Sequence, residues 1–102
     1  MDVQMVQAKI KAECVADIQA GAQKMFAAIN VEQPEGIRYA SCLLPDGETF
    51  VAFLQLDNGV ENPLPGMAEF REFLETVEAV RAAPAEVQPL TVVGSYRLFA
   101  TP

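Results

Sequence analysis

Residues 36–57 read GIRYASCLLPDGETFVAFLQLD, and this stretch decides the fold that we expect for the chain. It has the pattern of two strands around a tight turn, because Pro45 presets φ for a turn and Gly47 tolerates positive φ. We expect a two-residue loop at Asp46 and Gly47. The facing pairs of this register are Leu44–Thr49, Leu43–Phe50, Tyr39–Leu54 and Ile37–Leu56.

This register sorts the hairpin into two faces, because successive side chains of a strand point to opposite sides of the sheet. One face is an ordinary core face with Ile37, Tyr39, Ser41, Leu43, Phe50, Ala52, Leu54 and Leu56. The other face holds Arg38, Ala40, Cys42, Leu44, Thr49, Val51, Phe53 and Gln55. It is too apolar to lie wholly in water, yet it carries Arg38 and Gln55. A three-residue loop would change the facing pairs and set Arg38 against Leu54.

Length, charge and residue types exclude several classes of function. The 102 residues suit one domain, which we expect to span residues 1–102. The net charge of −7 disfavours nucleic acid, because phosphates would be repelled. The absence of histidine excludes imidazole-based zinc, haem and nucleophile sites, so we expect no metal and no cofactor. Cys14 and Cys42 are expected to be reduced thiols that act as small hydrophobic residues.

The N-terminal residues MDVQMVQAKIKAE lack the basic start and apolar run of a secretory signal. No apolar stretch approaches the roughly 20 residues that a membrane span needs. We therefore expect a cytoplasmic protein with no membrane partner.

The remaining elements follow from apolar periodicity. Strands are expected at residues 5–12 and 90–99, helices at 15–29 and 65–82, and connectors at 57–66 and 83–89. The order β-α-β-β-α-β predicts a ferredoxin-like α+β fold. Its four-stranded antiparallel sheet would have the spatial order fourth, first, third, second, with both helices on one face.

The sheet face away from the helices is the expected functional surface. It carries an unusual number of apolar residues for a solvated face, among them Val51 and Phe53. We expect four of the seven Lys and Arg residues to project from it as well. Both features favour two sheets packing face to face in a symmetric homodimer, with a partly polar, positively lined cavity between them. The candidate ligand-binding residues are Lys9, Lys11, Arg38, Phe53, Gln55 and Arg97.

At this level the chain resembles the dimeric α+β barrel superfamily, and in particular the antibiotic-biosynthesis-monooxygenase-like domains. The likeness covers nearly the whole chain and rests on its length and element order. The stretches that carry it are MVQAKIKA, PDGETFVAFLQL, MAEFREFLETV and VVGSYRLF. None of these is a catalytic motif, so the resemblance speaks to the fold more than to the function.

The resemblance implies several activities, because the superfamily includes cofactor-independent oxygenases of polyphenols, haem-degrading enzymes and isomerases. The haem-degrading members use an Asn, a Trp and a His, and this chain has neither Trp nor His. The quinone-forming oxygenases use an Asn, a Trp, a Tyr and an Arg. The residues that could stand in for these are Tyr39, Tyr96, Arg38, Arg97 and Asn30, and none is assigned a catalytic role.

Three hypotheses about function remain open from the sequence. The first is a small-molecule enzyme, such as a cofactor-independent monooxygenase of an aromatic or phenolic substrate. The second is a non-catalytic dimeric module that binds a small aromatic or acidic molecule. The third is a structural protein whose second sheet face only forms the dimer.

Overall fold

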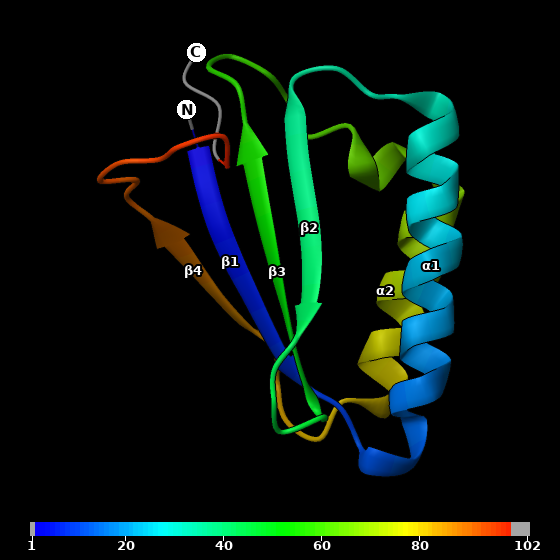
Figure 1. The fold of residues 1–102 in the computed structure, drawn as a ribbon. Coiled ribbons are helices and arrows are strands. Elements are labelled where there is room, and N and C mark those ends of the chain that lie inside the picture. The colour runs from blue at the N-terminus through cyan, green and yellow to red at the C-terminus, as the bar shows by residue number, and fades with distance from the viewer. Residues whose placement is uncertain (1, 99–102) are drawn as a thin grey trace.

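The computed structural model describes residues 2–98, which form a sheet covered on one face by two helices (Figure 1). The strands are β1 (Asp2–Lys9), β2 (Ile37–Leu43), β3 (Thr49–Leu56) and β4 (Glu86–Leu90). The helices are α1 (Val15–Glu32) and α2 (Ala68–Val80), with short 3-10 helices η1 (Ala12–Cys14) and η2 (Leu64–Gly66). All paired strands are antiparallel in the order β2-β3-β1-β4. The predicted ferredoxin-like α+β fold is therefore confirmed.

The predicted register of the hairpin is also confirmed. Ile37 faces Leu56, Tyr39 faces Leu54 and Leu43 faces Phe50. The turn is closed by the Gly47 N–H, which donates to the Leu44 carbonyl oxygen at 2.9 Å, and Gly47 has a φ of 74°. The Leu44 N–H then donates to the Thr49 oxygen at 2.8 Å. The connection is thus longer than the two-residue loop expected, but the facing pairs are unchanged.

The core lies between the sheet and the helices, as the alternation predicted. One buried cluster joins Leu54 of β3 to Leu64 and Met67, with Ile37, Tyr39 and Leu56 packed against it. A second cluster joins Ala8, Ile10 and Ile18, with Phe50 and Phe73 against it. None of the helices between residues 2 and 98 is long and apolar enough to cross a membrane.

The ends of three predicted elements differ from the structure. The first strand begins at Asp2 and ends at Lys9, because the Lys11 N–H bonds to the Val80 oxygen and the chain turns into η1. Helix α1 continues past residue 29 to Glu32 and stops at Gln33, which has a left-handed φ of 50°. Helix α2 begins at Ala68 rather than residue 65, since extended Met67 separates it from η2.

The prediction of a final strand at residues 90–99 was wrong. Strand β4 is Glu86–Leu90, which the sequence analysis had assigned to a connector, and 91–98 belong to no strand. Glu86 pairs with Gln7 and Leu90 with Val3, so the free edge of β1 is already occupied. Pro89 is tolerated because β4 is an edge strand, where a missing N–H can face away from the ladder. Phe99 lies outside the described residues.

Candidate functional site

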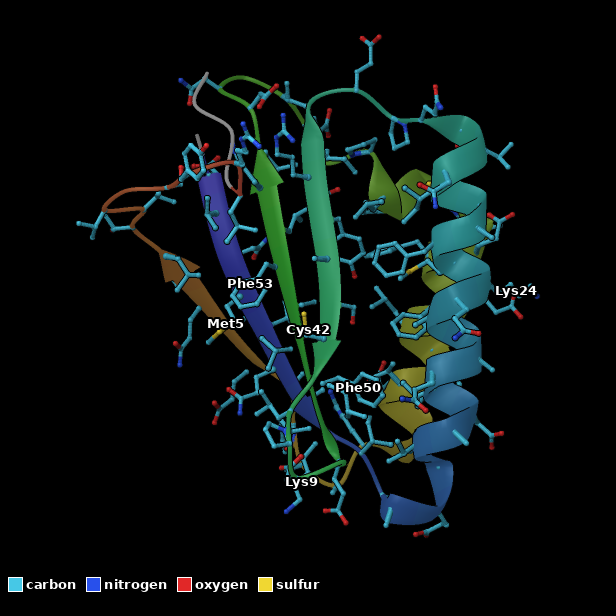
Figure 2. All side chains as sticks on the ribbon, in the orientation of Figure 1. Met5, Lys9, Lys24, Cys42, Phe50 and Phe53 are labelled. Atoms are coloured by element: carbon cyan, nitrogen blue, oxygen red, sulfur yellow. The ribbon has the colours of Figure 1, made fainter. Side chains whose placement is uncertain are left out.

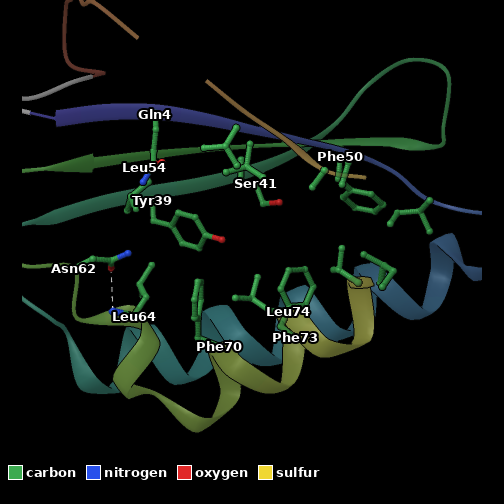
Figure 3. Close-up of a pocket in the computed structure, with 18 residues that line it drawn as sticks. Gln4, Tyr39, Ser41, Phe50, Leu54, Asn62, Leu64, Phe70, Phe73 and Leu74 are labelled. Atoms are coloured by element: carbon green, nitrogen blue, oxygen red, sulfur yellow. Dashed lines mark hydrogen bonds between the residues drawn. The ribbon is translucent and has the colours of Figure 1, made fainter. Parts of the chain in front are cut away.

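A pocket of about 300 Å³ lies between the sheet and the two helices (Figure 3). Its floor comes from the helix-facing side chains of β1, β2 and β3, and its roof from α2 and η2. The lining residues are Gln4, Val6, Ala8, Ile10, Ile18, Tyr39, Ser41, Phe50, Ala52, Leu54, Asn62, Leu64, Phe70, Phe73, Leu74, Val77, Ala85 and Val87. Binding sites for small molecules commonly have volumes from about 300 Å³ upward, so this space can hold a small ring system.

The pocket is apolar and its walls are rich in aromatic rings. Tyr39, Phe50, Phe70 and Phe73 all line it. No Asp, Glu, Lys or Arg is among the lining residues, all of which belong to the described part of the chain. A charged ligand would lose its hydration here without gaining an ion partner, so the pocket suits a neutral, flat, largely apolar molecule.

Tyr39 is the most chemically distinctive of the lining aromatics. Its ring stacks on Phe26 of α1 with centroids 5.2 Å apart and meets Phe70 of α2 edge-on at 6.3 Å. Burial raises the pKa of the Tyr39 hydroxyl, because the phenolate form loses solvation. The hydroxyl therefore stays protonated at neutral pH, and in Figure 3 it points along the pocket, where it can donate or accept a hydrogen bond.

Asn62 closes one end of the pocket from the loop that precedes η2. Its side-chain oxygen accepts a hydrogen bond from the Leu64 N–H at 3.0 Å, an Asx turn that leads the chain through Pro63 into η2. An amide whose oxygen is engaged presents its NH₂ group on its other side. Figure 3 shows this end of Asn62 turned away from Leu64, toward the space beside Tyr39 and Leu54.

Two further polar side chains line the floor. Gln4 lies on β1 between Leu54 and Pro89, and Ser41 lies on β2 opposite Ala52. Both occupy helix-facing positions, where the strand period of two would normally place apolar residues. The pocket thus offers donors and acceptors at several points around an apolar interior, which is the usual design of a small-molecule site.

Three of the predicted ligand-binding residues lie together on the opposite side of the sheet. We call this side the open face; it holds the odd-numbered residues of β1 and β3 and the even-numbered residues of β2. Arg38 faces Gln55 across the β2–β3 ladder, and Phe53 follows two residues earlier on β3. Gln55 is almost fully buried, with 1% of its surface exposed, whereas Arg38 is exposed. Figure 2 shows Phe53 with Met5 and Cys42 on this side, and Phe50 toward the helices.

The other three predicted residues come from other parts of the chain. Lys9 pairs with Thr49, six residues along β3 from Gln55 and therefore about 20 Å away. Its Nζ lies 3.8 Å from a Glu48 carboxylate oxygen. Lys11 follows the end of β1. Arg97 belongs to no strand, because β4 ends at Leu90, and its guanidinium stacks over the Tyr96 ring at 5.1 Å. Lys11 and Arg97 therefore lie outside the strands from which the four basic residues were expected to project.

Asn62, Gln4 and Ser41 were not among the residues predicted for the site. The suggested stand-in, Asn30, is exposed near the end of α1, and Tyr96 is 81% exposed. The signal for Asn62 was the run Asn-Pro-Leu-Pro-Gly in the 57–66 connector, because an Asn before Pro favours a side-chain-capped turn. Gln4 and Ser41 were detectable as polar residues in otherwise apolar helix-facing positions.

Within residues 2–98, no three His, Cys, Asp or Glu side chains come together as a possible metal site. The two thiols, Cys14 and Cys42, are free. The pocket is therefore the feature of the described structure that best fits a small-molecule site.

Comparison with known proteins gives similarity in structure but none in sequence. No family model and no curated protein matches the sequence. An antibiotic-biosynthesis-monooxygenase-like protein from Nitrosomonas europaea superposes with a TM-score of 0.74 at 16% identity, covering 92% of this chain and 100% of that chain. Rv0793 from Mycobacterium tuberculosis superposes with a TM-score of 0.71 at 16% identity, covering 92% of this chain and 96% of that one.

A third similar structure is an asparagine-to-alanine variant of SnoaB, a cofactor-independent oxygenase from Streptomyces nogalater. Its TM-score is 0.66 at 17% identity, and the alignment covers 94% of this chain and 97% of that chain. The chain therefore shares the fold of these solved structures, which include antibiotic-biosynthesis-monooxygenase-like proteins.

Proposed function

We propose that the protein is a cofactor-independent monooxygenase of a neutral, fused-ring phenol that binds in the pocket between the sheet and the helices. The observation that carries this proposal is the pocket itself: about 300 Å³, aromatic walls, no charged lining residue, and Tyr39 and Asn62 as hydrogen-bonding groups. The structural similarity to a cofactor-independent oxygenase supports it.

The proposed reaction balances without a reductant. A dihydroxynaphthalene and one O₂ give a hydroxynaphthoquinone and one water. The phenolate supplies the electrons that reduce dioxygen, and a new C–O bond forms at the ring. The O–O bond then breaks, one oxygen remains as the quinone carbonyl, and the other leaves as water with the hydrogens lost from that ring carbon and from the hydroxyl.

The residues contribute binding and electrostatics to this reaction. The Asn62 NH₂ donates a hydrogen bond to the substrate oxygen, an interaction that strengthens as negative charge develops there. Tyr39, held neutral by its raised pKa, donates a second hydrogen bond rather than acting as a base. The apolar walls exclude water, which strengthens both hydrogen bonds.

The test is aerobic incubation with a panel of dihydroxynaphthalenes and single-ring phenols, with oxygen uptake measured by electrode and quinone by absorbance. We expect one O₂ consumed per quinone formed and loss of turnover in Tyr39→Phe and Asn62→Ala. Arg38→Ala is the matched control, because Arg38 lies on the open face and should leave turnover unchanged. No uptake above the rate without protein, for any member of the panel, would reject the oxygenase proposal.

A second candidate function, a non-catalytic binder of the same ligands, is favoured by a specific observation. None of the lining residues is a base at neutral pH. Catalysis thus requires a phenol acidic enough to ionise without a protein base, whereas binding does not. A ligand-dependent rise in melting temperature without oxygen uptake would support the binder.

The proposed assembly is a symmetric homodimer through the open face. This face carries apolar side chains that the helices do not cover, among them the half-buried Met5 and Phe53. Beside the sheet, the 91–98 segment exposes Val93, Tyr96 and Leu98. Exposed apolar surface of this kind is typical of protein interfaces, and a second copy would meet it with the same residues. We propose that the six predicted residues Lys9, Lys11, Arg38, Phe53, Gln55 and Arg97 contribute to this interface rather than to the pocket.

A further inference from the structure

Two of the residues that line the pocket are exposed to solvent, and the rest are buried or half-buried. The exposed pair is Leu74, at 48%, and Val87, at 60%. Leu74 lies on α2 and Val87 on β4, so the two exposed lining residues come from different elements. A lining residue that is also solvent-exposed marks a place where the pocket meets the surface.

The side of the pocket opposite α1 is bounded by these two elements. Strand β4 is the edge of the sheet, paired with β1 through Val87 and Val6. Figure 1 shows β4 diverging from α2, with the connector 81–85 joining them at one end. Leu74 of α2 and Val87 of β4 are the exposed lining residues on these two elements.

Contacts within the chain border the pocket at other places, and a second hollow of about 260 Å³ lies beside it between α1 and β2. At the connector end, the Ala82 N–H donates to the Lys9 oxygen at 2.7 Å and the Lys11 N–H to the Val80 oxygen at 3.1 Å. At the far end, the Asn62–Leu64 hydrogen bond caps the turn into η2, where the Leu64 side chain is fully buried. Helices α1 and α2 approach closely at Gly21, where a Cβ would lie 3.4 Å from the Phe73 ring.

From this geometry we infer that ligands enter the pocket between α2 and β4, and that Leu74 and Val87 limit the width of what can enter. The inference rests on the proposed function only in taking the pocket as a binding site. Beyond the proposed function, we infer that Leu74 and Val87 select substrates by size. Neither residue needs to touch the reacting atoms of the bound substrate.

The chemistry of this entrance also restricts the ligand class. Both entrance side chains are apolar, and α2 presents exposed Glu75 beside Leu74. The next carboxylate along α2, that of Glu78, lies 3.7 Å from the Arg81 guanidinium. A carboxylate at the rim repels anions and leaves neutral molecules unaffected. The entrance and the uncharged interior thus select for the same class, neutral ring systems without a carboxylate or phosphate.

The test follows the binding rate of the neutral dye N-phenylnaphthylamine by stopped-flow fluorescence. Leu74→Trp and Val87→Trp each add bulk at the entrance. We expect association and dissociation rates to fall together by about tenfold, with little change in Kd, because an entrance residue acts on the barrier more than on the bound state. Leu74→Ala and Val87→Ala should raise both rates.

Two control variants separate this inference from the proposed function. Val31→Trp places the same bulk at an 83% exposed site on α1 and should leave both rates unchanged. Ala52→Leu fills the floor of the pocket and should raise the Kd of the dye. Both tryptophan variants lie at exposed positions, and their melting temperatures report whether folding is retained.

The outcomes differ for the two proposals. If Ala52→Leu weakens dye binding but neither Trp variant slows it by more than about twofold, the entrance is elsewhere and this inference fails while the site stands. If wild-type protein shows no saturable dye binding, or Ala52→Leu has no effect on it, the pocket is not the binding site. In that case both the proposed function and the entrance are refuted.

Discussion

The side-chain oxygen of Asn62 accepts a hydrogen bond from the Leu64 N–H at 3.0 Å, and this contact fixes the orientation of an amide at one end of the pocket. A side chain used in this way has both a local role, as the cap of the turn into η2, and a potential role toward a ligand through its NH₂ group. The two roles use different atoms and can be separated by substitution.

Asn62→Asp and Asn62→Ala should therefore have different effects. The alanine variant loses the acceptor for the Leu64 N–H, and its free energy of unfolding should fall by about 1 kcal/mol. The aspartate variant keeps the acceptor and should be close to the wild type in stability, but it loses the NH₂ donor and adds a negative charge beside a developing phenolate. Urea denaturation and oxygen uptake measure the two effects, and wild-type turnover in Asn62→Asp would exclude the donor role.

Two glycines with similar backbone conformations offer a matched test of packing beside the hairpin. Gly36 has a φ of +80° and Gly59 a φ of +77°, so alanine is strained at both, by about 1 kcal/mol. A Cβ on Gly36 would also lie 2.8 Å from both methyl carbons of Val60, whereas nothing lies within 4 Å of one on Gly59. Gly36→Ala should lower the free energy of unfolding by about 1–3 kcal/mol more than Gly59→Ala.

The clash can be confirmed by a double variant. Adding Val60→Ala to Gly36→Ala removes the two methyl groups that the new Cβ would meet. The double variant should recover part of the stability that Gly36→Ala loses, and urea unfolding would show this as a rise in the denaturation midpoint. Equal losses in Gly36→Ala and Gly59→Ala would contradict the clash.

The hairpin turn should make stability depend on pH in the acid range. Asp46 accepts hydrogen bonds from the Thr49 hydroxyl and from the N–H groups of Glu48 and Thr49, and these hold the pKa of its carboxyl below the usual value. A carboxyl with a lowered folded-state pKa stabilises the protein above its unfolded pKa of about 4. This contribution is lost as the pH falls through the folded-state pKa.

The pH prediction is checked by urea unfolding of the wild type and two variants between neutral and acid pH. Asp46→Asn should be less stable than the wild type near neutrality and should lose stability less steeply below about pH 4. Glu35→Gln, which removes an exposed carboxylate from the connector between α1 and β2, is the control. If all three proteins share one acid profile, the turn does not contribute to it.

The proposed dimer is tested at Phe53, which lies on the open face between Met5 of β1 and Ala40 of β2. Phe53→Asp would bury a charge at the centre of the interface, so we expect a monomer or an aggregate in sedimentation. Val31→Asp at an exposed site of α1 should leave the dimer unchanged. A wild-type particle of about 11 kDa at micromolar concentration would refute the dimer, and a stable Phe53→Asp dimer would place the interface elsewhere.

The register of the hairpin and the division of its faces could be predicted from the sequence because both are local properties. A Pro-Asp-Gly turn sets where two adjacent strands meet, and the period of two then assigns each side chain to a face. The order of elements and the apolar stripes of the helices were sufficient for the fold class, since few arrangements bury those stripes on one sheet.

The last strand and the pocket depended on the tertiary structure. The alternating residues from Leu90 onward are typical of a half-buried strand. In the structure, however, residues Glu86–Leu90 pair with β1, because the connector from α2 brings this part of the chain next to β1. Likewise, the period of two identified Tyr39, Ser41 and Leu54 as helix-facing without showing that a hollow lies above them. That hollow depends on the summed side-chain volumes of strands, helices and the Asn62 loop, which meet only in the folded chain.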